Sequence, residues 1–166
     1  MSLDQNLLKR FEKNIYNNVS LSKFSWFNLG GPAEYLFKPE NESQLIEFFK
    51  ENKNEKLKIT ILGAGSNTLV RDKGVKGVVI KLGPKFSEIK LINKDTIEVG
   101  AAALDRKVSN FAKENGIGNF EFLSCIPGSV GGAVVMNSGC YGDDISKILQ
   151  SITVIEKNSC KKKEIN

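Results

Sequence analysis

One uncharged stretch of 21 residues constrains this chain most. Residues 122–142 read FLSCIPGSVGGAVVMNSGCYG and include five glycines, whereas 26% of the 166-residue chain is charged. Pro127, Asn137 and the glycines argue against a membrane-spanning helix here. Two interpretations stay open: small residues that let core elements pack closely, or a backbone surface that lies against a large flat ligand.

The second interpretation makes specific demands on this stretch. Ser129 follows Pro127-Gly128 and is expected to cap the start of a short helix. Backbone N–H groups at a helix start favour an anionic group. The donors expected here belong to Gly131, Gly132 and Ala133.

A second glycine-rich loop follows a short β-branched run. Residues 57–62 predict a strand that leads directly into a loop of five residues. Glycines let consecutive N–H groups point into one concavity, which suits a phosphate, although an ordinary tight turn is the alternative. The loop is neither a Walker loop nor a good Rossmann fingerprint, because no Gly-Lys-Ser/Thr follows and Thr68 occupies the third glycine position. Its members are Gly63, Ala64, Gly65, Ser66 and Asn67.

Composition excludes several kinds of chemistry. The chain has no histidine, so neither a Ser-His-Asp triad nor a histidine metal site can be built, and no metal is expected. Cys125, Cys140 and Cys160 lack disulfide-like or metal-ligand spacing and favour a reducing compartment, the cytoplasm. Lysines interleaved with acids produce the net charge of +5, so no nucleic-acid partner is expected. Residues 1–13 resemble no signal peptide, and no membrane association is expected.

The hydrophobic pattern predicts an α+β fold with two lobes, residues 1–82 and 83–166, and a boundary near Gly83-Pro84. The first lobe has βαβ-like order, and the second has a more antiparallel character. Asn41 is expected to cap a helix, with Gln44 completing a capping box. Helices are expected at 3–16, after 41 and at 104–112, a loop at 17–33, and strands at 33–38, 57–62, 77–82, 88–92, 96–99 and from 152.

The glycine motifs and their order resemble the UDP-N-acetylenolpyruvoylglucosamine reductase (MurB) family. Cys125 is a departure, because the family more often has glycine there. The matching segments run in family order from about residue 20 to about residue 156. They are FNLGGPA (27–33), LGAGSNTL (62–69), GAA (100–102), IPGSVGGA (126–133), MNSG (136–139) and Tyr141-Gly142.

The resemblance implies an FAD-binding fold of the PCMH or vanillyl-alcohol-oxidase type, with FAD held between two lobes. It implies that NADPH reduces the flavin, which then reduces UDP-GlcNAc-enolpyruvate to UDP-N-acetylmuramate for peptidoglycan synthesis, and hence for cell shape and division. The implied partners are therefore this cofactor and a UDP-sugar substrate, with no oligomeric state implied. The implied FAD contacts are Gly63, Ala64, Gly65, Ser66, Asn67, Ile126, Gly128, Ser129, Gly131, Gly132 and Ala133.

The family's catalytic arginine, serine and glutamate motifs match no segment of this chain. We therefore expect an N-terminal portion without catalytic residues, whose second lobe is incomplete at its C-terminus and whose C-terminal substrate domain is absent. Three alternatives stay open. They are a stand-alone, non-catalytic FAD-binding module, another PCMH-type flavin oxidoreductase, and a domain without flavin whose glycines serve only packing.

Overall fold

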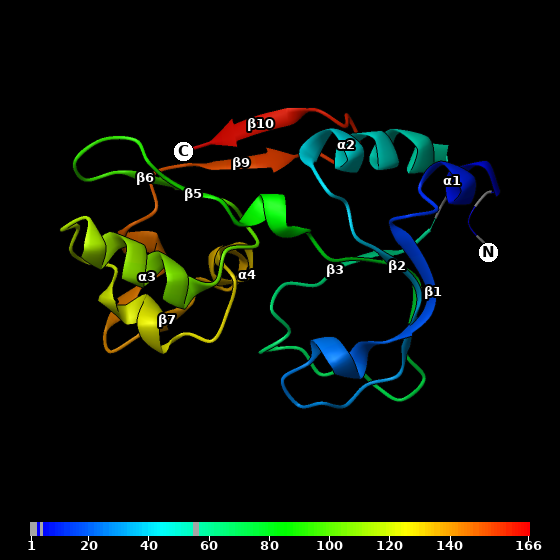
Figure 1. The fold of residues 1–166 in the computed structure, drawn as a ribbon, viewed down its shortest axis with the longest axis horizontal. Coiled ribbons are helices and arrows are strands. Elements are labelled where there is room, and N and C mark those ends of the chain that lie inside the picture. Colours follow the sequence, from blue (N-terminus) through cyan, green and yellow to red (C-terminus); the bar gives the residue numbers. More distant parts are fainter. Residues whose placement is uncertain (1–2, 4, 55–56) are drawn as a thin grey trace. The chain divides into compact units, whose positions relative to one another are not determined.

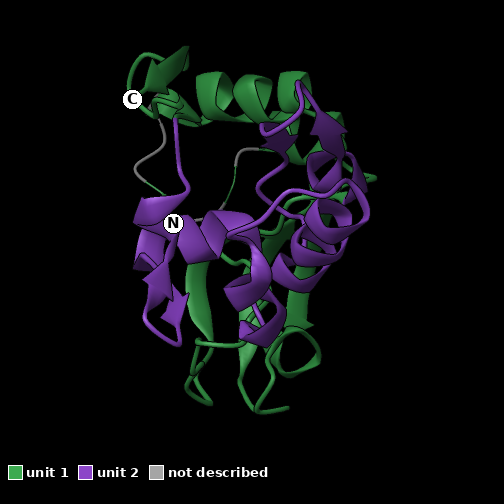
Figure 2. Cartoon of the chain, turned by 90° about the vertical axis from the view of Figure 1, so that its left-hand side faces the viewer, with its two compact units in different colours: residues 1–83, 151–166 green, residues 84–150 purple. Residues whose placement is uncertain are grey.

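The chain forms two compact units, which Figure 2 colours separately. The structure, a computed structural model, describes residue 3, residues 5–54 and residues 57–166. One unit comprises residues 1–83 and 151–166, and the other comprises residues 84–150. Residues 151–166, which the sequence analysis assigned to the second lobe, group with the first unit instead.

The first unit is built on a four-stranded sheet with the strand order β1-β2-β4-β3. Figure 1 labels three of these strands, β1, β2 and β3. Strands β2 and β3 both run parallel to β4, while β1 is antiparallel to β2. Three neighbouring strands therefore end at the same edge of the sheet. The strands are β1 (Ile15–Ser20), β2 (Pro32–Phe37), β3 (Ile59–Ile61) and β4 (Val75–Ile80).

Two helices, α1 (Gln5–Arg10) and α2 (Glu42–Glu51), pack on the first unit through aromatic side chains. The ring of Phe37 on β2 stacks on Phe48 of α2 at 4.4 Å between centroids, and the Phe11 ring meets Phe37 at 5.4 Å. All three rings are fully buried. Edge and stacked aromatic contacts add to the hydrophobic stabilisation that burial supplies.

The expected cap of α2 is confirmed. The Asn41 side-chain oxygen accepts a hydrogen bond from the Gln44 backbone N–H at 2.9 Å. The return bond differs from a standard capping box, because the Gln44 side chain accepts from the N–H of Glu40 rather than that of Asn41. Two backbone N–H groups at the helix start, those of Glu40 and Gln44, are therefore hydrogen-bonded to side chains.

The expected helix over residues 3–16 is wrong in its length. Helix α1 ends at Arg10, and β1 takes up residues 15–16 of the expected helix and residues 17–20 of the expected loop. Residue 4 lies outside the described residues. Among the apolar residues at helical spacing in this stretch, Leu3, Leu7, Phe11 and Ile15 are nonetheless buried, and Leu8 is half-buried. Strand β1 has no alternating pattern, and it forms because its backbone pairs with β2.

The second unit combines small antiparallel strand pairs with two helices. Strand β5 (Ile89–Leu91) pairs with β6 (Ile97–Val99), which confirms the expected hairpin. Helix α3 (Asp105–Glu114) ends before Gly116, whose φ of 69° suits a residue without a side chain. The remaining elements are α4 (Val130–Met136), β7 (Gly139–Cys140) and β8 (Asp143–Asp144), and the buried core is Ala103, Val108, Phe122, Leu123, Ala133 and Ile145.

The terminal segment forms an antiparallel hairpin of β9 (Ile152–Ile155) and β10 (Lys162–Ile165). Lys162 of β10 forms an ion pair with Glu42 of α2 at 2.9 Å. This ion pair joins the terminal hairpin to the first unit, with which residues 151–166 group. Among the described residues, no helix has the length and apolar character needed to cross a membrane.

Candidate functional site

The loop Gly63–Asn67 lies at the sheet edge where β3 ends. Leu62 makes the last sheet-like bond, from its N–H to the carbonyl of Ile80 at 2.9 Å. The five N–H groups that follow have no hydrogen-bond acceptor within residues 5–54 and 57–166, and neither do the side chains of Ser66 and Asn67. A row of unpaired N–H groups in a tight loop favours an anion such as a phosphate.

The shape of this loop depends on Gly65. Its φ is +76°, and a Cβ atom at this position would lie 1.9 Å from the carbonyl oxygen of Phe24. The Gly65 carbonyl in turn accepts a bond from the N–H of Trp26, and the Ser25 hydroxyl donates to the carbonyl of Thr68. Residues 24–26 therefore hold the loop in place, and a side chain at position 65 is excluded.

The second glycine segment begins after the 3-10 helix Glu121–Cys125, at Ile126. Helix α4 starts after Ser129, as expected, although the Ser129 side chain makes no capping bond. The N–H of Val130 donates to the carbonyl of Ala103, and Asp105 N–H donates to the carbonyl of Gly128. These bonds attach the segment to the residues that lead into α3.

The expectation that Gly131, Gly132 and Ala133 all supply donors to an anion needs correction. The Gly131 N–H bonds to the carbonyl of Ala101 at 2.8 Å, and the Ala133 N–H bonds to the carbonyl of Ser129 at 2.8 Å. Both donors are thus used inside the unit. In the part of the chain that the structure describes, the N–H groups of Gly128, Ser129 and Gly132 have no acceptor, and Gly132 is exposed.

A buried carboxyl group lies beneath Gly128. A Cβ atom on Gly128 would lie 2.4 Å from a side-chain oxygen of Asp105, so a larger residue here would require the Asp105 side chain to move. Asp105 is 0% exposed, and neither of its side-chain oxygens has a hydrogen-bond partner within the described ranges. Burial raises the pKa of Asp105 to about 6. No sequence signal marked this residue.

Two further residues that the sequence analysis did not select lie at the edge of the first unit's sheet. The Lys81 ammonium donates to the carbonyl of Gly63 at 2.6 Å, next to the unpaired N–H groups. Lys38 and Lys81 both lie near the ring of Phe24. Burial, and to a smaller degree the charge of Lys38, hold the pKa of Lys81 below its usual value. Within the described ranges, no group of three metal-ligating side chains occurs.

These features define a class of protein. The α+β fold and its two glycine-rich loops agree with a family model described as an FAD binding domain, which matches residues 33–159. The chain therefore belongs to the FAD binding domain family.

The most similar known proteins narrow the class further. The chain is 47% identical to the UDP-N-acetylenolpyruvoylglucosamine reductase of Pelagibacter ubique (strain HTCC1062) over 95% of its own length and 53% of the relative's. It also resembles the crystal structure of the enzyme of the same name, MurB, from Thermus caldophilus, with a TM-score of 0.75, 30% identity, and coverage of 90% of this chain and 51% of that one. The chain thus spans about half the length of these relatives.

A more distant likeness concerns the fold alone. A structure of alkyldihydroxyacetonephosphate synthase gives a TM-score of 0.69 at 11% identity, over 99% of this chain and 38% of that one. Together with the FAD family match and the MurB structure, this likeness confirms the expected α+β fold of FAD-binding type.

Proposed function

We propose that this chain is the FAD-binding part of a UDP-N-acetylmuramate dehydrogenase. In this reaction, NADPH provides the electrons that reduce UDP-GlcNAc-enolpyruvate to UDP-N-acetylmuramate, a precursor of peptidoglycan. The names of the relatives and the FAD family match support this proposal. The observation that carries it is the loop Gly63–Asn67, where five consecutive N–H groups lack acceptors within the described residues.

The described residues fit the cofactor. Gly65 has a positive φ that suits glycine, and the unpaired N–H groups around it form a loop that suits a diphosphate; a side chain at position 65 would meet the Phe24 carbonyl and displace this loop. In the second unit, we propose that Gly128, Ser129 and Gly132 offer N–H donors. Ile126 and Gly131, which are half-buried, would present small and apolar groups to a ligand, whereas Ala133 lies in the buried core and is not available for this role. Bound FAD would supply the hydride chemistry, which amino acid side chains lack.

The proposal assigns no proton transfer to this chain. It has no histidine, and its two glycine-rich segments supply mainly backbone groups. We propose that the chain binds the cofactor in the cytoplasm and does not turn over the UDP-sugar substrate by itself. The role of these residues is to bind and orient the cofactor.

Titration with FAD tests the binding proposal. We expect the purified chain to bind FAD and to change the visible absorbance of the flavin. Replacing Asn67 with Asp keeps the size of the side chain but adds a negative charge beside the proposed diphosphate, so FAD affinity is expected to fall about tenfold or more.

Asn110→Asp is the matched control, because Asn110 is exposed on α3 in the other unit. It is expected to bind FAD as the unchanged chain does. A folded chain that binds no FAD contradicts the proposed function, and equal losses in both variants contradict the role of the loop.

A further inference from the structure

Two lysines follow two neighbouring parallel strands. Lys38 comes directly after β2, and Lys81 comes directly after β4. The loop that starts at Gly63 comes just after β3, on the other side of β4. Because the three strands are parallel, their carboxyl ends share one edge of the sheet, which is where open parallel sheets bind ligands.

The ring of Phe24 brings the two lysines together. The Lys38 ammonium nitrogen lies 4.8 Å from the ring centroid, and that of Lys81 lies 5.7 Å from it. Both distances are within the range of cation–π attraction. This ring belongs to the 3-10 helix Leu21–Phe24, which is followed by Trp26, whose N–H donates to the Gly65 carbonyl. The ring therefore connects the two lysines to the glycine loop within the first unit.

Neither lysine has a carboxylate partner among the described residues, whereas Lys90, Lys147 and Lys162 each form an ion pair. Lys38 and Lys81 are also only partly exposed. Two positive charges near one ring repel each other, and partial burial removes water that would screen them. The lowered pKa of Lys81 has both of these causes. An anion placed between the lysines and the loop's N–H groups would relieve this cost.

We propose that Lys38 and Lys81 form a cationic subsite that binds a phosphoryl group of a nucleotide diphosphate next to the loop Gly63–Asn67. The inference rests on the proposed function only in naming FAD as that nucleotide. Lys81, already oriented by its bond to the Gly63 carbonyl, donates to the diphosphate, and Lys38 adds a second charge. Charge-assisted bonds of this kind are stronger than those from neutral donors.

The test compares three probes on the full 166-residue chain by calorimetric titration. FAD and ADP contain a diphosphate, and riboflavin contains none. Lys81→Met and Lys38→Met keep the apolar stem and remove the charge. We expect each change to weaken FAD and ADP binding by about tenfold, and to leave riboflavin binding within about twofold of the unchanged chain.

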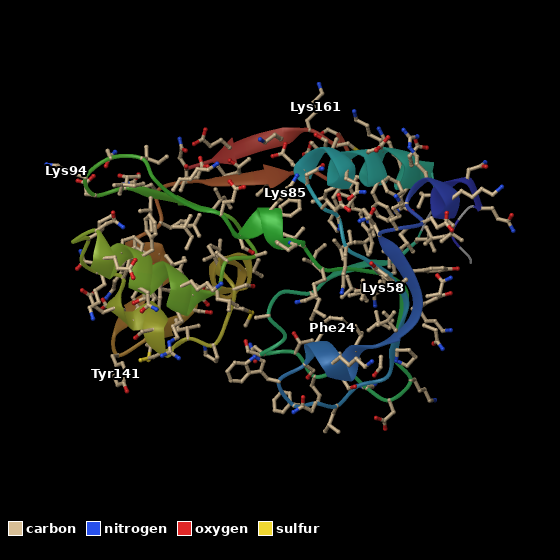
Figure 3. The ribbon with its side chains drawn as sticks, in the orientation of Figure 1. Phe24, Lys58, Lys85, Lys94, Tyr141 and Lys161 are labelled. Atoms are coloured by element: carbon tan, nitrogen blue, oxygen red, sulfur yellow. The ribbon has the colours of Figure 1, made fainter. Side chains whose placement is uncertain are left out.

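Lys58→Met is the matched control, because Lys58 is an exposed lysine that lies just before β3, at the opposite edge of the same sheet (Figure 3). It is expected to bind all three probes normally. Unchanged FAD and ADP affinities in both test variants would overturn the subsite and leave the proposed function intact. An equal loss of riboflavin binding would also overturn it, since the lysines would then act only on the fold.

The remaining outcomes separate the two proposals. Lysine-dependent binding of ADP without any binding of FAD supports the subsite and contradicts the proposed function. A chain that binds neither FAD nor ADP contradicts both.

Discussion

At the scale of single residues, Asp105 shows where a hydrophobic pattern misleads. The spacing of Leu104, Val108 and Ala112 predicts that Leu104 faces the core. In the structure Leu104 is 45% exposed, and Asp105 is 0% exposed. Leu104 has extended backbone angles because it precedes the first turn of α3, so the helical period does not apply to it. Asp105, the next residue, is buried instead, and its carboxyl group has no hydrogen-bond partner among the described residues.

This burial predicts a pH-dependent stability. The pKa of Asp105 is about 6 in the folded chain and near 3.8 when unfolded, so between these values the folded state holds a proton that the unfolded state has lost. Stability therefore falls as pH rises from about 4 to about 6, by on the order of 2 kcal/mol. Asp105→Asn has no such proton. The free energy of unfolding of this variant, relative to that of the unchanged chain, is therefore expected to increase from about pH 4 to about pH 6 and to stay constant above that.

Urea unfolding at several pH values measures this difference. Asp95→Asn is the matched control, because it makes the same substitution in the exposed turn of the β5–β6 hairpin. If the difference between Asp105→Asn and the unchanged chain does not vary with pH, the carboxyl group is not the source of the effect.

At the scale of elements, the sequence predicts the loop Gly63–Asn67 but does not predict strand β1. The loop Gly63–Asn67 follows a β-branched strand, and its glycines mark it clearly in the sequence. Strand β1 has polar residues at Asn17 and Asn18, and Asn18 has a φ of 53°. Nothing local predicts a strand from such residues, because the strand forms only when β2 lies beside it.

The loop also predicts a large cost for one methyl group. Gly65→Ala places a Cβ atom against the Phe24 carbonyl and forces alanine into a positive φ. Gly116→Ala requires a similar φ of +69° but meets no atom within 4 Å. Both variants should lose about 1 kcal/mol to backbone strain, and Gly65→Ala about 1–3 kcal/mol more from the overlap.

Denaturant unfolding measures the loss of unfolding free energy in each variant. Subtracting the loss in Gly116→Ala from that in Gly65→Ala leaves the cost of the steric overlap, because both variants share the backbone strain. Equal losses of stability would show that the loop rearranges without cost. FAD affinity should fall in Gly65→Ala and stay unchanged in Gly116→Ala, which lies at the end of α3.

At the scale of the whole molecule, the chain contains two glycine-rich loops and spans about half the length of the reductases it resembles. The expected α+β fold agrees with the structure, whereas the position of the last hairpin does not follow from its sequence. A hairpin can pack against any suitable neighbour, and its own residues do not say which. The ion pair of Lys162 with Glu42 joins residues 120 positions apart.

The proposed lack of turnover is tested at this scale. With UDP-GlcNAc-enolpyruvate, NADPH and saturating FAD, we expect the purified chain to show no substrate-dependent oxidation of NADPH. The Pelagibacter ubique reductase, assayed in parallel, is the positive control for the reagents. A rate that rises in proportion to the concentration of the chain would contradict the proposal.

The sequence by itself determined the local features of this protein: the glycine loops, the cap at Asn41, the hairpin of β5 and β6, and the absence of histidine chemistry. These depend on residues close together in the chain, whose conformational limits act locally. Only the tertiary structure decided which groups meet. Lys38 and Lys81 are 43 positions apart and become neighbours because β2 and β4 pair in parallel, and Asp105 loses its water because α3 packs into the core. Charge and burial of this kind arise from long-range packing, which no short stretch of sequence contains.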